Sequence, residues 1–419
     1  MQKAISEMGF ENPTEIQKAV IPQLIENDIN LIGLAQTGTG KTAAFGLPLI
    51  EKIDFDERSV QGLVLAPTRE LCQQIAEQLQ QFSKFEKGLN MTAVYGGAAI
   101  QQQMRSLKRP NQIIIATPGR LIDLIKRKAV RLDKVKYLVL DEADEMLNMG
   151  FQEEIDHILS YTPEEKLTWL FSATMPPEIK KIVRKYMKKP VEVKVNRGKE
   201  MNKDIDHQFL IVNNSKKYDV LIRVLEANHD IRGVIFCRTR LDTQRLAEKL
   251  VKDGLKADSI HGDLSQSQRT RVMERFKNGS LQLLVATDVA ARGIDVNDLS
   301  HVIHYTIPED NSYYTHRSGR TARAGKKGIS LALVSNRDKG RLFRMEKQLG
   351  IRFSKMALPS REEIMQGHIE AFCNRILDIE YKGFLEKKYE TQGIIMLEHL
   401  SKQELIAKVL MMEIGKLKK

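Results

Sequence analysis

Short apolar runs that alternate with amphipathic segments constrain the fold of this chain more than any other feature. In the first half of the chain these runs lie at 31–34, 63–65, 113–115, 137–140 and 169–171. Continuous runs of this length are typical of strands that are buried on both faces of a parallel sheet. Amphipathic segments at 70–82 and 119–128 lie between the runs, and strands that alternate with such helices indicate an α/β domain.

The same alternation starts again beyond a polar stretch. Residues 196–204 have no periodicity, which indicates a linker. Strand-like runs follow at 233–237, 257–260, 283–286, 301–304 and 330–334. We therefore predict the fold class α/β, with two parallel-sheet lobes at 1–196 and 205–359 that are joined by a linker at 197–204.

The last sixty residues, 360–419, have a different character. Ser360 and Ser401 each stand three residues before a glutamate, the spacing of a capping box that starts a helix. Ten basic and ten acidic side chains make 361–419 neutral, so we expect this helical C-terminal segment to bind protein rather than RNA. We predict a homodimer through 360–419; the alternative is a helical satellite packed on the second lobe.

Charge and composition limit the kinds of binding partner and the cellular locations that fit this chain. The chain carries 66 Lys and Arg against 54 Asp and Glu, and this net charge of +12 favours a polyanion as partner. Because the C-terminal segment is neutral, the surplus lies in the first 360 residues. No apolar run is long enough to cross a membrane, no secretion leader is visible, and three distant cysteines form no disulfide framework. We expect a cytoplasmic protein.

A glycine-rich loop follows the first apolar run directly. Residues 35–42 match the phosphate-binding pattern G-x-x-x-x-G-K-S/T except that Ala35 replaces the first glycine. Gly38 and Gly40 let backbone N–H groups surround a phosphate. Lys41 can reach the β- and γ-phosphates, and the Thr42 hydroxyl suits Mg²⁺. The alternative is a plain turn between a strand and a helix.

An acidic tetrad, Asp141-Glu142-Ala143-Asp144, follows the run at 137–140. An ATPase needs a carboxylate at the end of a neighbouring strand, where Asp141 can hold Mg²⁺ through water and Glu142 can orient or deprotonate the attacking water. Taken alone, such a tetrad is more often a solvated turn. Behind an apolar strand and together with the phosphate loop, it indicates a nucleotide site.

This tetrad is the sequence that names the DEAD-box RNA helicases, and the chain resembles that family, in its bacterial type, from about Gly9 to Gly328. Further matching segments occur in the family's order at 9–17, 67–71, 96–97, 117–120, 172–174, 234–238, 287–295 and 316–323. The resemblance implies two RecA-like lobes that bind ATP, Mg²⁺ and RNA. It also implies RNA-dependent ATP hydrolysis that drives RNA release, with local unwinding of duplexes or remodelling of ribonucleoproteins.

The resemblance also implies roles for individual residues. The ATP-binding set is Phe10, Gln17, Gln36, Thr37, Gly38, Thr39, Gly40, Lys41, Thr42 and Asp295. The set that couples the nucleotide to RNA is Asp144, Ser172, Thr174 and His316. Phe10 offers an aromatic face to a base, and the Gln17 amide matches the N6/N7 edge of adenine. Their alternative reading is a core residue and a helix-surface residue.

Two arginines of the second lobe complete the predicted catalytic set of Lys41, Asp141, Glu142, Arg320 and Arg323. Arg320 and Arg323 are three residues apart, which places them on one helical face if the segment is helical. In the family they are the arginine fingers, which stabilise charge on the γ-phosphate. The alternative is a basic surface that contacts nucleic acid.

The predicted RNA contacts are charged and hydroxyl side chains and one glycine that suit phosphates and sugars: Arg69, Gly97, Thr117, Arg120, Arg269 and Thr287. We therefore expect RNA binding that is largely independent of sequence, with 2′-hydroxyl contacts that favour RNA over DNA. Ribosomal or RNA-decay complexes are candidate partners.

The chain also departs from the family pattern. Ala322 stands where most members have glycine; because alanine is unfavourable at positive φ, we expect a helical or extended backbone there. The family's upstream aromatic is missing, so we expect weaker adenine binding. Two rivals stay open: a DNA-directed superfamily 2 helicase, and an RNA clamp that closes with ATP and scarcely turns over.

Overall fold

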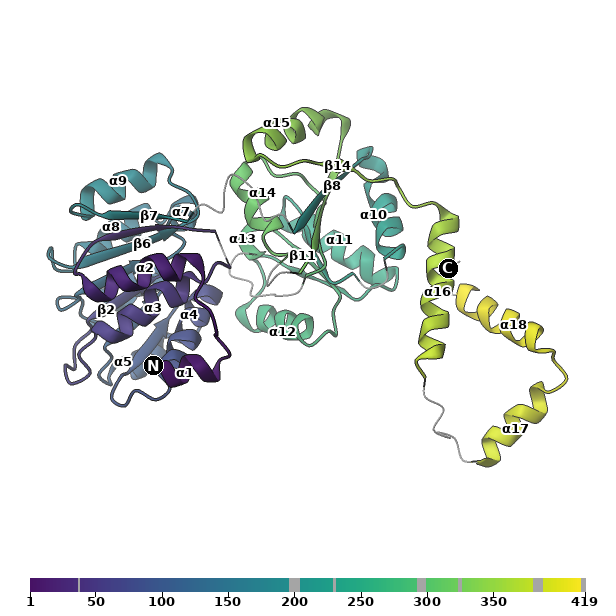
Figure 1. The fold of residues 1–419 in the computed structure, drawn as a ribbon, viewed down its shortest axis with the longest axis horizontal. Coiled ribbons are helices and arrows are strands. Elements are labelled where there is room, and N and C mark those ends of the chain that lie inside the picture. Colours follow the sequence, from purple (N-terminus) through teal and green to yellow (C-terminus); the bar gives the residue numbers. More distant parts are fainter. Residues whose placement is uncertain are drawn as a thin grey trace.

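The computed structural model describes residues 1–36, 38–195, 204–228, 231–291, 299–322, 326–379 and 387–415. Within them the chain forms two seven-stranded parallel sheets followed by a group of C-terminal helices (Figure 1). This confirms the predicted fold class of two α/β lobes with a helical segment. Of the predicted linker at 197–204, only Asp204 lies inside the described residues.

The first sheet has the strand order β3-β4-β2-β5-β6-β1-β7. Its strands are β1 (Leu31–Leu34), β2 (Gly62–Leu65), β3 (Met91–Val94), β4 (Ile113–Ala116), β5 (Tyr137–Leu140), β6 (Leu167–Ser172) and β7 (Val191–Lys194). Its helices are α1 (Gln2–Glu7), α2 (Glu15–Glu26), α3 (Lys41–Lys52), α4 (Arg69–Phe82), α5 (Ile100–Leu107), α6 (Pro118–Lys126), α7 (Ala143–Asn148), α8 (Gln152–Leu159) and α9 (Pro177–Tyr186).

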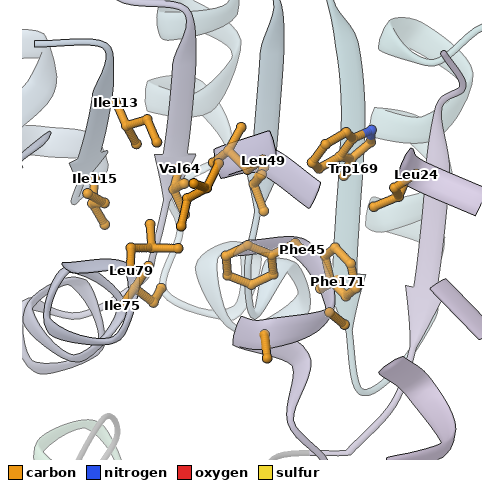
Figure 2. Packing of buried hydrophobic residues seen from close by; sticks show 14 of the residues in the cluster. Leu24, Phe45, Leu49, Val64, Ile75, Leu79, Ile113, Ile115, Trp169 and Phe171 are labelled. Atoms are coloured by element: carbon orange, nitrogen blue, oxygen red, sulfur yellow. The ribbon is translucent and has the colours of Figure 1, made fainter. Parts of the chain in front are cut away.

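Successive residues of these strands point to opposite faces of the sheet, so each face has its own apolar core. On one face Phe45 of α3 packs against Phe171 of β6, with ring centroids 5.2 Å apart, and Trp169 lies beside them (Figure 2). On the other face Leu63 and Leu138 pack against α6 and α8. The continuous burial explains why these strands read as unbroken apolar runs.

The second sheet has the order β10-β11-β9-β12-β13-β8-β14. Its strands are β8 (Ile205–Ile211), β9 (Gly233–Phe236), β10 (Ala257–Ile260), β11 (Leu283–Ala286), β12 (His301–His304), β13 (Gly328–Val334) and β14 (Ser354–Lys355). Its α-helices are α10 (Lys217–Glu226), α11 (Arg240–Lys252), α12 (Gln266–Lys277), α13 (Asp288–Ala291), α14 (Asn311–Ser318) and α15 (Lys339–Leu349).

Every apolar run predicted as a strand lies on one, but four further strands were not predicted. β3 and β7 are edge strands with partly exposed side chains, and β14 has only two residues. β8 alternates buried and exposed positions along much of its length. Strands without a continuous apolar run give a weaker pattern, which explains the omissions.

The C-terminal segment contains α16 (Arg361–Leu377), α17 (Lys387–Leu397) and α18 (Lys402–Gly415). Both predicted capping boxes are present: the Ser360 hydroxyl accepts from the N–H of Glu363 at 3.0 Å, and Ser401 accepts from Glu404 at 3.2 Å. Helix α17 was not predicted. Near the start of α16, Ile364 is buried, whereas α17 and α18 stand away from the second lobe (Figure 1).

Among the described residues, no helix is both long and apolar enough to cross a membrane.

Candidate active site and nucleic-acid interface

The glycine-rich loop lies between the carboxyl end of β1 and the start of α3. Gly38 and Gly40 have φ of +79° and +87°, a region that only glycine enters easily, so both glycines are required by the turn. Lys41 begins α3, and its Nζ is buried without a hydrogen bond to any residue that the structure describes. Since a buried unpaired ammonium is costly, this loop fits an anionic ligand such as a triphosphate.

A cavity of about 510 Å³ lies beside this loop. Its walls come from the loop itself, from residues 14–16 at the start of α2, and from residues 173–175 after β6. The cavity therefore brings together two segments that the sequence assigned to ATP and one that it assigned to coupling.

Asp141 and Glu142 follow β5, whose strand end lies near that of β1. Asp141 is buried, and burial raises the pKa of its carboxyl to about 6, opposed by the positive charge of Lys41. Glu142 has φ of +49° and its N–H donates to Asp141 Oδ1 at 2.9 Å. A non-glycine residue held in this strained region is frequent at catalytic positions. Carboxylate and hydroxyl oxygens suit Mg²⁺, so Asp141 and Thr42 fit that ion.

Gln17 contacts the phosphate loop directly. Its Nε2 donates to the carbonyl of Gly40 at 3.1 Å, and its Oε1 accepts from the N–H of Thr14 at 2.8 Å. The second contact belongs to a capping box that starts α2. Phe10 is 52% exposed, so its ring face is accessible. The structure thus links the predicted adenine-reading segment to the phosphate loop through Gln17.

Asp144 is buried and is the centre of a hydrogen-bonded cluster. The N–H and the hydroxyl of Thr174 donate to Asp144 Oδ2 at 2.9 and 2.7 Å. The Ser172 hydroxyl donates to the carbonyl of Thr174 at 2.7 Å, and the carbonyl of Ser172 accepts from the N–H of Ala35 in the phosphate loop at 3.0 Å. Three of the four predicted coupling residues therefore form one connected group beside the nucleotide site.

The fourth coupling residue, His316, lies on α14 of the second lobe. Its Nδ1 is 3.7 Å from Oε2 of Glu145, a buried glutamate on α7 of the first lobe. The two lobes therefore meet immediately beside the acidic tetrad. Sequence reasoning missed Glu145, because an acidic residue after Asp144 reads as the solvated first turn of a helix.

The region of the predicted arginine fingers differs from expectation in two ways. Helix α14 ends at Ser318, so helical spacing does not place Arg320 and Arg323 on one face. Ala322 has φ of +57°, so the expectation of a helical or extended backbone there was wrong. The chain therefore has a left-handed backbone at an alanine. Arg323 itself lies outside the described residues.

The predicted RNA contacts of the first lobe gather at the carboxyl ends of β2, β3 and β4. The Arg69 guanidinium packs on Gly97, where a Cβ atom would lie only 1.9 Å from its Nη1. Arg120 donates to the carbonyl of Ala98 at 3.2 Å and to Oε1 of Gln103 at 2.8 Å. Thr117 precedes α6 at the same edge. These contacts hold both guanidinium groups in place.

Two contacts join this edge to the second lobe. Arg69 donates to Oε1 of Gln266 on α12 at 2.9 Å. Arg269, also on α12, forms an ion pair with Glu70 at 2.7 Å and donates to the carbonyl of Ala290 at 2.6 Å. Burial lowers the pKa of Arg269, opposed by the charge of Glu70. Neither Glu70 nor Gln266 was predicted to take part.

Comparisons with known proteins agree with this geometry. A model of the DEAD/DEAH box helicase family matches residues 14–182, and one of the helicase conserved C-terminal domain matches residues 216–325. The DEAD-box ATP-dependent RNA helicase CshA of Geobacillus kaustophilus is 44% identical over 90% of this chain and 81% of the relative. The chain belongs to the DEAD-box ATP-dependent RNA helicases. This family identity makes it an RNA-dependent ATPase and RNA helicase.

Other DEAD-box proteins extend the likeness. CshA of Limosilactobacillus reuteri is 42% identical, over 97% of this chain and 82% of that protein. The structure of Saccharomyces cerevisiae Dbp5 bound to RNA and ADP BeF3 has a TM-score of 0.79 and 30% identity, and covers 90% of this chain and 96% of that chain. A structure of Mss116p bound to ssRNA and AMP-PNP has a TM-score of 0.77 and 30% identity, and the match covers 87% of this chain and 79% of that chain.

Within this DEAD-box protein, two predicted ATP-binding residues, Thr37 and Asp295, lie outside the described residues. Gln36 and Thr39 line the cavity beside the phosphate loop. Thr287 is buried at the carboxyl end of β11. The second lobe also holds a pair that sequence reasoning missed: Arg317 donates through both Nε and Nη2 to the carboxylate of Asp288, at 2.5 and 2.7 Å.

Proposed function

We propose that ATP is hydrolysed at a site that is complete only when the second lobe meets the first on RNA. The observation that carries this proposal is the buried Lys41 ammonium, which has no hydrogen-bond partner among the described residues, beside the buried carboxyl of Asp141. A phosphate chain between the loop and this carboxylate supplies the missing partner for Lys41. Contacts between the lobes at His316 and Arg269 support a site shared by both.

Each residue of the site then has one role. Lys41 binds the β- and γ-phosphates through its ammonium group. The Thr42 hydroxyl and the Asp141 carboxylate would hold Mg²⁺, which would supply positive charge to the phosphates. Glu142 orients the attacking water and takes its proton. Arg320, together with Arg323, neutralises charge that develops on the γ-phosphate as the lobes close.

Adenine recognition is proposed for Phe10 and Gln17, and ribose contact for Asp295. The hydrogen bond from Gln17 to the Gly40 carbonyl supports this assignment, because a base that binds Gln17 also orders the phosphate loop. Gln36, Thr37 and Thr39 complete the loop.

Asp144, Ser172, Thr174 and His316 couple the nucleotide site to RNA in this proposal. The cluster links the phosphate loop, the acidic tetrad and the strand end of β6 by hydrogen bonds of 2.7 to 3.0 Å. A shift of the loop therefore changes the geometry at Asp144. The adjacent Glu145 faces His316, so a change at Asp144 alters this contact with the second lobe.

RNA lies across both lobes in this proposal, in contact with Arg69, Gly97, Thr117 and Arg120 on the first and with Arg269 and Thr287 on the second. The groups present are guanidinium groups, hydroxyls and backbone, which suit phosphates and sugars rather than base edges. Binding is therefore largely independent of sequence and weakens as salt rises.

The test replaces one group in each lobe. Glu142→Gln should keep ATP and RNA binding but abolish turnover, since the amide cannot accept the proton. Arg320→Ala should lower kcat by about 10³-fold with ATP binding nearly unchanged, the scale of an arginine finger. Matched controls are Glu153→Gln on α8 and Arg337→Ala before α15, both exposed. Normal turnover in Glu142→Gln, or RNA affinity lost at normal kcat in Arg320→Ala, would refute these roles.

We also propose a homodimer through 360–419. Apolar side chains of the C-terminal segment are exposed, among them Leu377 at 79% and Met412 at 72%. Among the described residues, the start of α16 packs on the second lobe next to α10, where Ile364 is buried and Arg223 donates to the Pro359 carbonyl. Exposed apolar surface of this kind is normally covered by a partner, and a symmetric copy is the commonest one.

Light scattering tests the homodimer. The full chain should run as a dimer at tens of micromolar, and a chain that ends after Pro359 should run as a monomer with RNA-dependent ATPase nearly intact. A monomeric full chain would refute the homodimer. Association with ribosomal or RNA-decay complexes and a cytoplasmic location stay predictions from the sequence.

A further inference from the structure

Most of the net positive charge of the chain is concentrated in one segment of the first lobe. Residues 105–136 contain ten Lys and Arg but only two Asp, a surplus of eight out of the +12 carried by the whole chain. Of these ten cations, only Arg120 belongs to the proposed RNA contacts. The other nine have no role in the function described above.

These cations lie at the opposite edge of the sheet from the proposed RNA contacts. Helices α5 and α6 start at the carboxyl edge, where Gly97 and Thr117 lie, and run to the amino edge. There α5 is followed by Lys108 and Arg109, while Lys126 ends α6 and Lys128 follows it. Helix α6 has nine residues, so the two edges are separated by about 14 Å along it.

The amino edge is hollowed into a groove of about 470 Å³, which we call the basic groove. It is lined by cationic side chains from three connections that precede β2, β4 and β5: Arg58, Arg109, Lys128, Arg131 and Lys134. The acidic residue in this lining is Asp133, and Arg131 binds both its oxygens at 3.2 and 3.0 Å. The groove therefore offers a concave surface of one sign of charge.

Several of these cations have no ion-pair partner within the described part of the chain. Arg127, Arg131 and Lys136 are paired with Asp123, Asp133 and Glu57. By contrast, Arg58, Lys108, Arg109, Lys128 and Lys134 are exposed and form no ion pair with a described residue. A helix dipole accounts for cations at the ends of α5 and α6, but not for Arg58 or Lys134, which lie on loops.

We propose that the basic groove is a second RNA-binding surface, which holds the phosphodiester backbone of RNA that continues beyond the segment bound across the two lobes. This inference rests on the proposed RNA binding and extends it. A single polyanion can occupy both edges, because α5 and α6 connect them over a short distance. Like-signed charges focused in a concave surface raise the local concentration of such a ligand.

RNA fits the groove better than an acidic protein segment does. RNA bound at the carboxyl edge is already within reach, so the second contact carries only the entropy cost of a short flexible connection. The groups are dispersed lysine and arginine side chains without an aromatic anchor among the lining residues, which suits phosphates rather than a folded protein surface.

The test compares a short RNA, which spans only the two-lobe face, with the same RNA lengthened at its 5′ or its 3′ end. The probe is anisotropy of labelled RNA with AMP-PNP and the full-length chain. The variant is Lys108→Glu/Arg109→Glu/Lys128→Glu. The matched control is Lys180→Glu/Lys181→Glu/Arg184→Glu on α9, which reverses three exposed charges of the same lobe.

The wild type should bind one lengthened RNA at least about tenfold more tightly than the short RNA, and the groove variant should lose that gain together with about two units of salt slope. The control variant should keep the gain. In the groove variant, affinity for the short RNA and stimulation of ATPase by the short RNA should stay at the wild-type level. If the wild type itself neither binds the short RNA nor is stimulated by it, the proposal that RNA binds across the two lobes is refuted. No gain with either lengthened RNA, an equal gain in wild type and groove variant, or groove-dependent binding of poly-glutamate without RNA would overturn the proposal.

Discussion

The ion pair between Glu70 and Arg269 provides a sharp test of how the lobes communicate. The two groups lie 2.7 Å apart, on α4 of the first lobe and α12 of the second, and each side chain is only 16% exposed. When the lobes separate, both groups return to water. Glu70→Gln should therefore destabilise the closed arrangement of the two lobes and leave the stability of each separate lobe unchanged.

The free-energy cost of the substitution follows from the burial of the ion pair. Removing the carboxylate leaves the Arg269 guanidinium desolvated in the closed arrangement, where the Ala290 carbonyl still accepts a hydrogen bond from it. Truncating one partner of a buried interface ion pair costs about 2 to 5 kcal/mol, and the residual exposure here favours the lower end. A penalty of about 2 kcal/mol weakens closure roughly 30-fold.

The assay is the RNA concentration that gives half-maximal stimulation of ATPase. It should rise roughly 30-fold in Glu70→Gln, because RNA must now also supply the lost closure energy. Glu77→Gln, on the same helix but exposed and without an ion pair to a described residue, is the control. Urea unfolding should be nearly unchanged in both variants. An unchanged half-maximal RNA concentration in Glu70→Gln would show that this contact does not stabilise the closed state.

Three further substitutions test other parts of the account. Gly40→Ala places a Cβ atom 2.4 Å from Nε2 of Gln17 at a φ of +87°, so ATP affinity by calorimetry should fall at least about tenfold; unchanged affinity contradicts the loop geometry. Asp144→Asn removes the charged acceptor of two hydrogen bonds from Thr174, so RNA stimulation of kcat should fall at least about tenfold while ATP affinity persists. Ala322→Gly relieves a φ of +57° and should raise the free energy of unfolding by about 0.5 kcal/mol; a decrease contradicts the strain.

Much of the fold could be predicted because buried parallel strands appear in the sequence as continuous apolar runs. Leu31–Leu34 and Tyr137–Leu140 are apolar runs followed at once by chemistry-bearing residues, so sequence alone located both the strands and the edge that carries the site. Edge strands such as Val191–Lys194 do not appear as continuous apolar runs, because their side chains are largely exposed.

The contacts between the lobes could not be predicted in the same way. Glu145 and Gln266 look like ordinary helix residues, and their contacts with His316 and Arg69 depend on the placement of the two lobes. Ala322 shows a different limit: its alanine argued against a left-handed backbone, but the surrounding turn imposes one. Local preference is overridden where neighbouring structure fixes the chain.

The most direct test of the central claim measures the distance between the lobes by single-molecule energy transfer. Cys72 and Cys237 are buried, so with Cys373 replaced by serine the dyes can be placed at Glu153→Cys and Arg337→Cys. AMP-PNP and RNA together should produce a high-transfer state that neither ligand produces alone, and Arg69→Ala should reduce its population. A distance that does not respond to the two ligands together would contradict a nucleotide site shared between lobes that close on RNA.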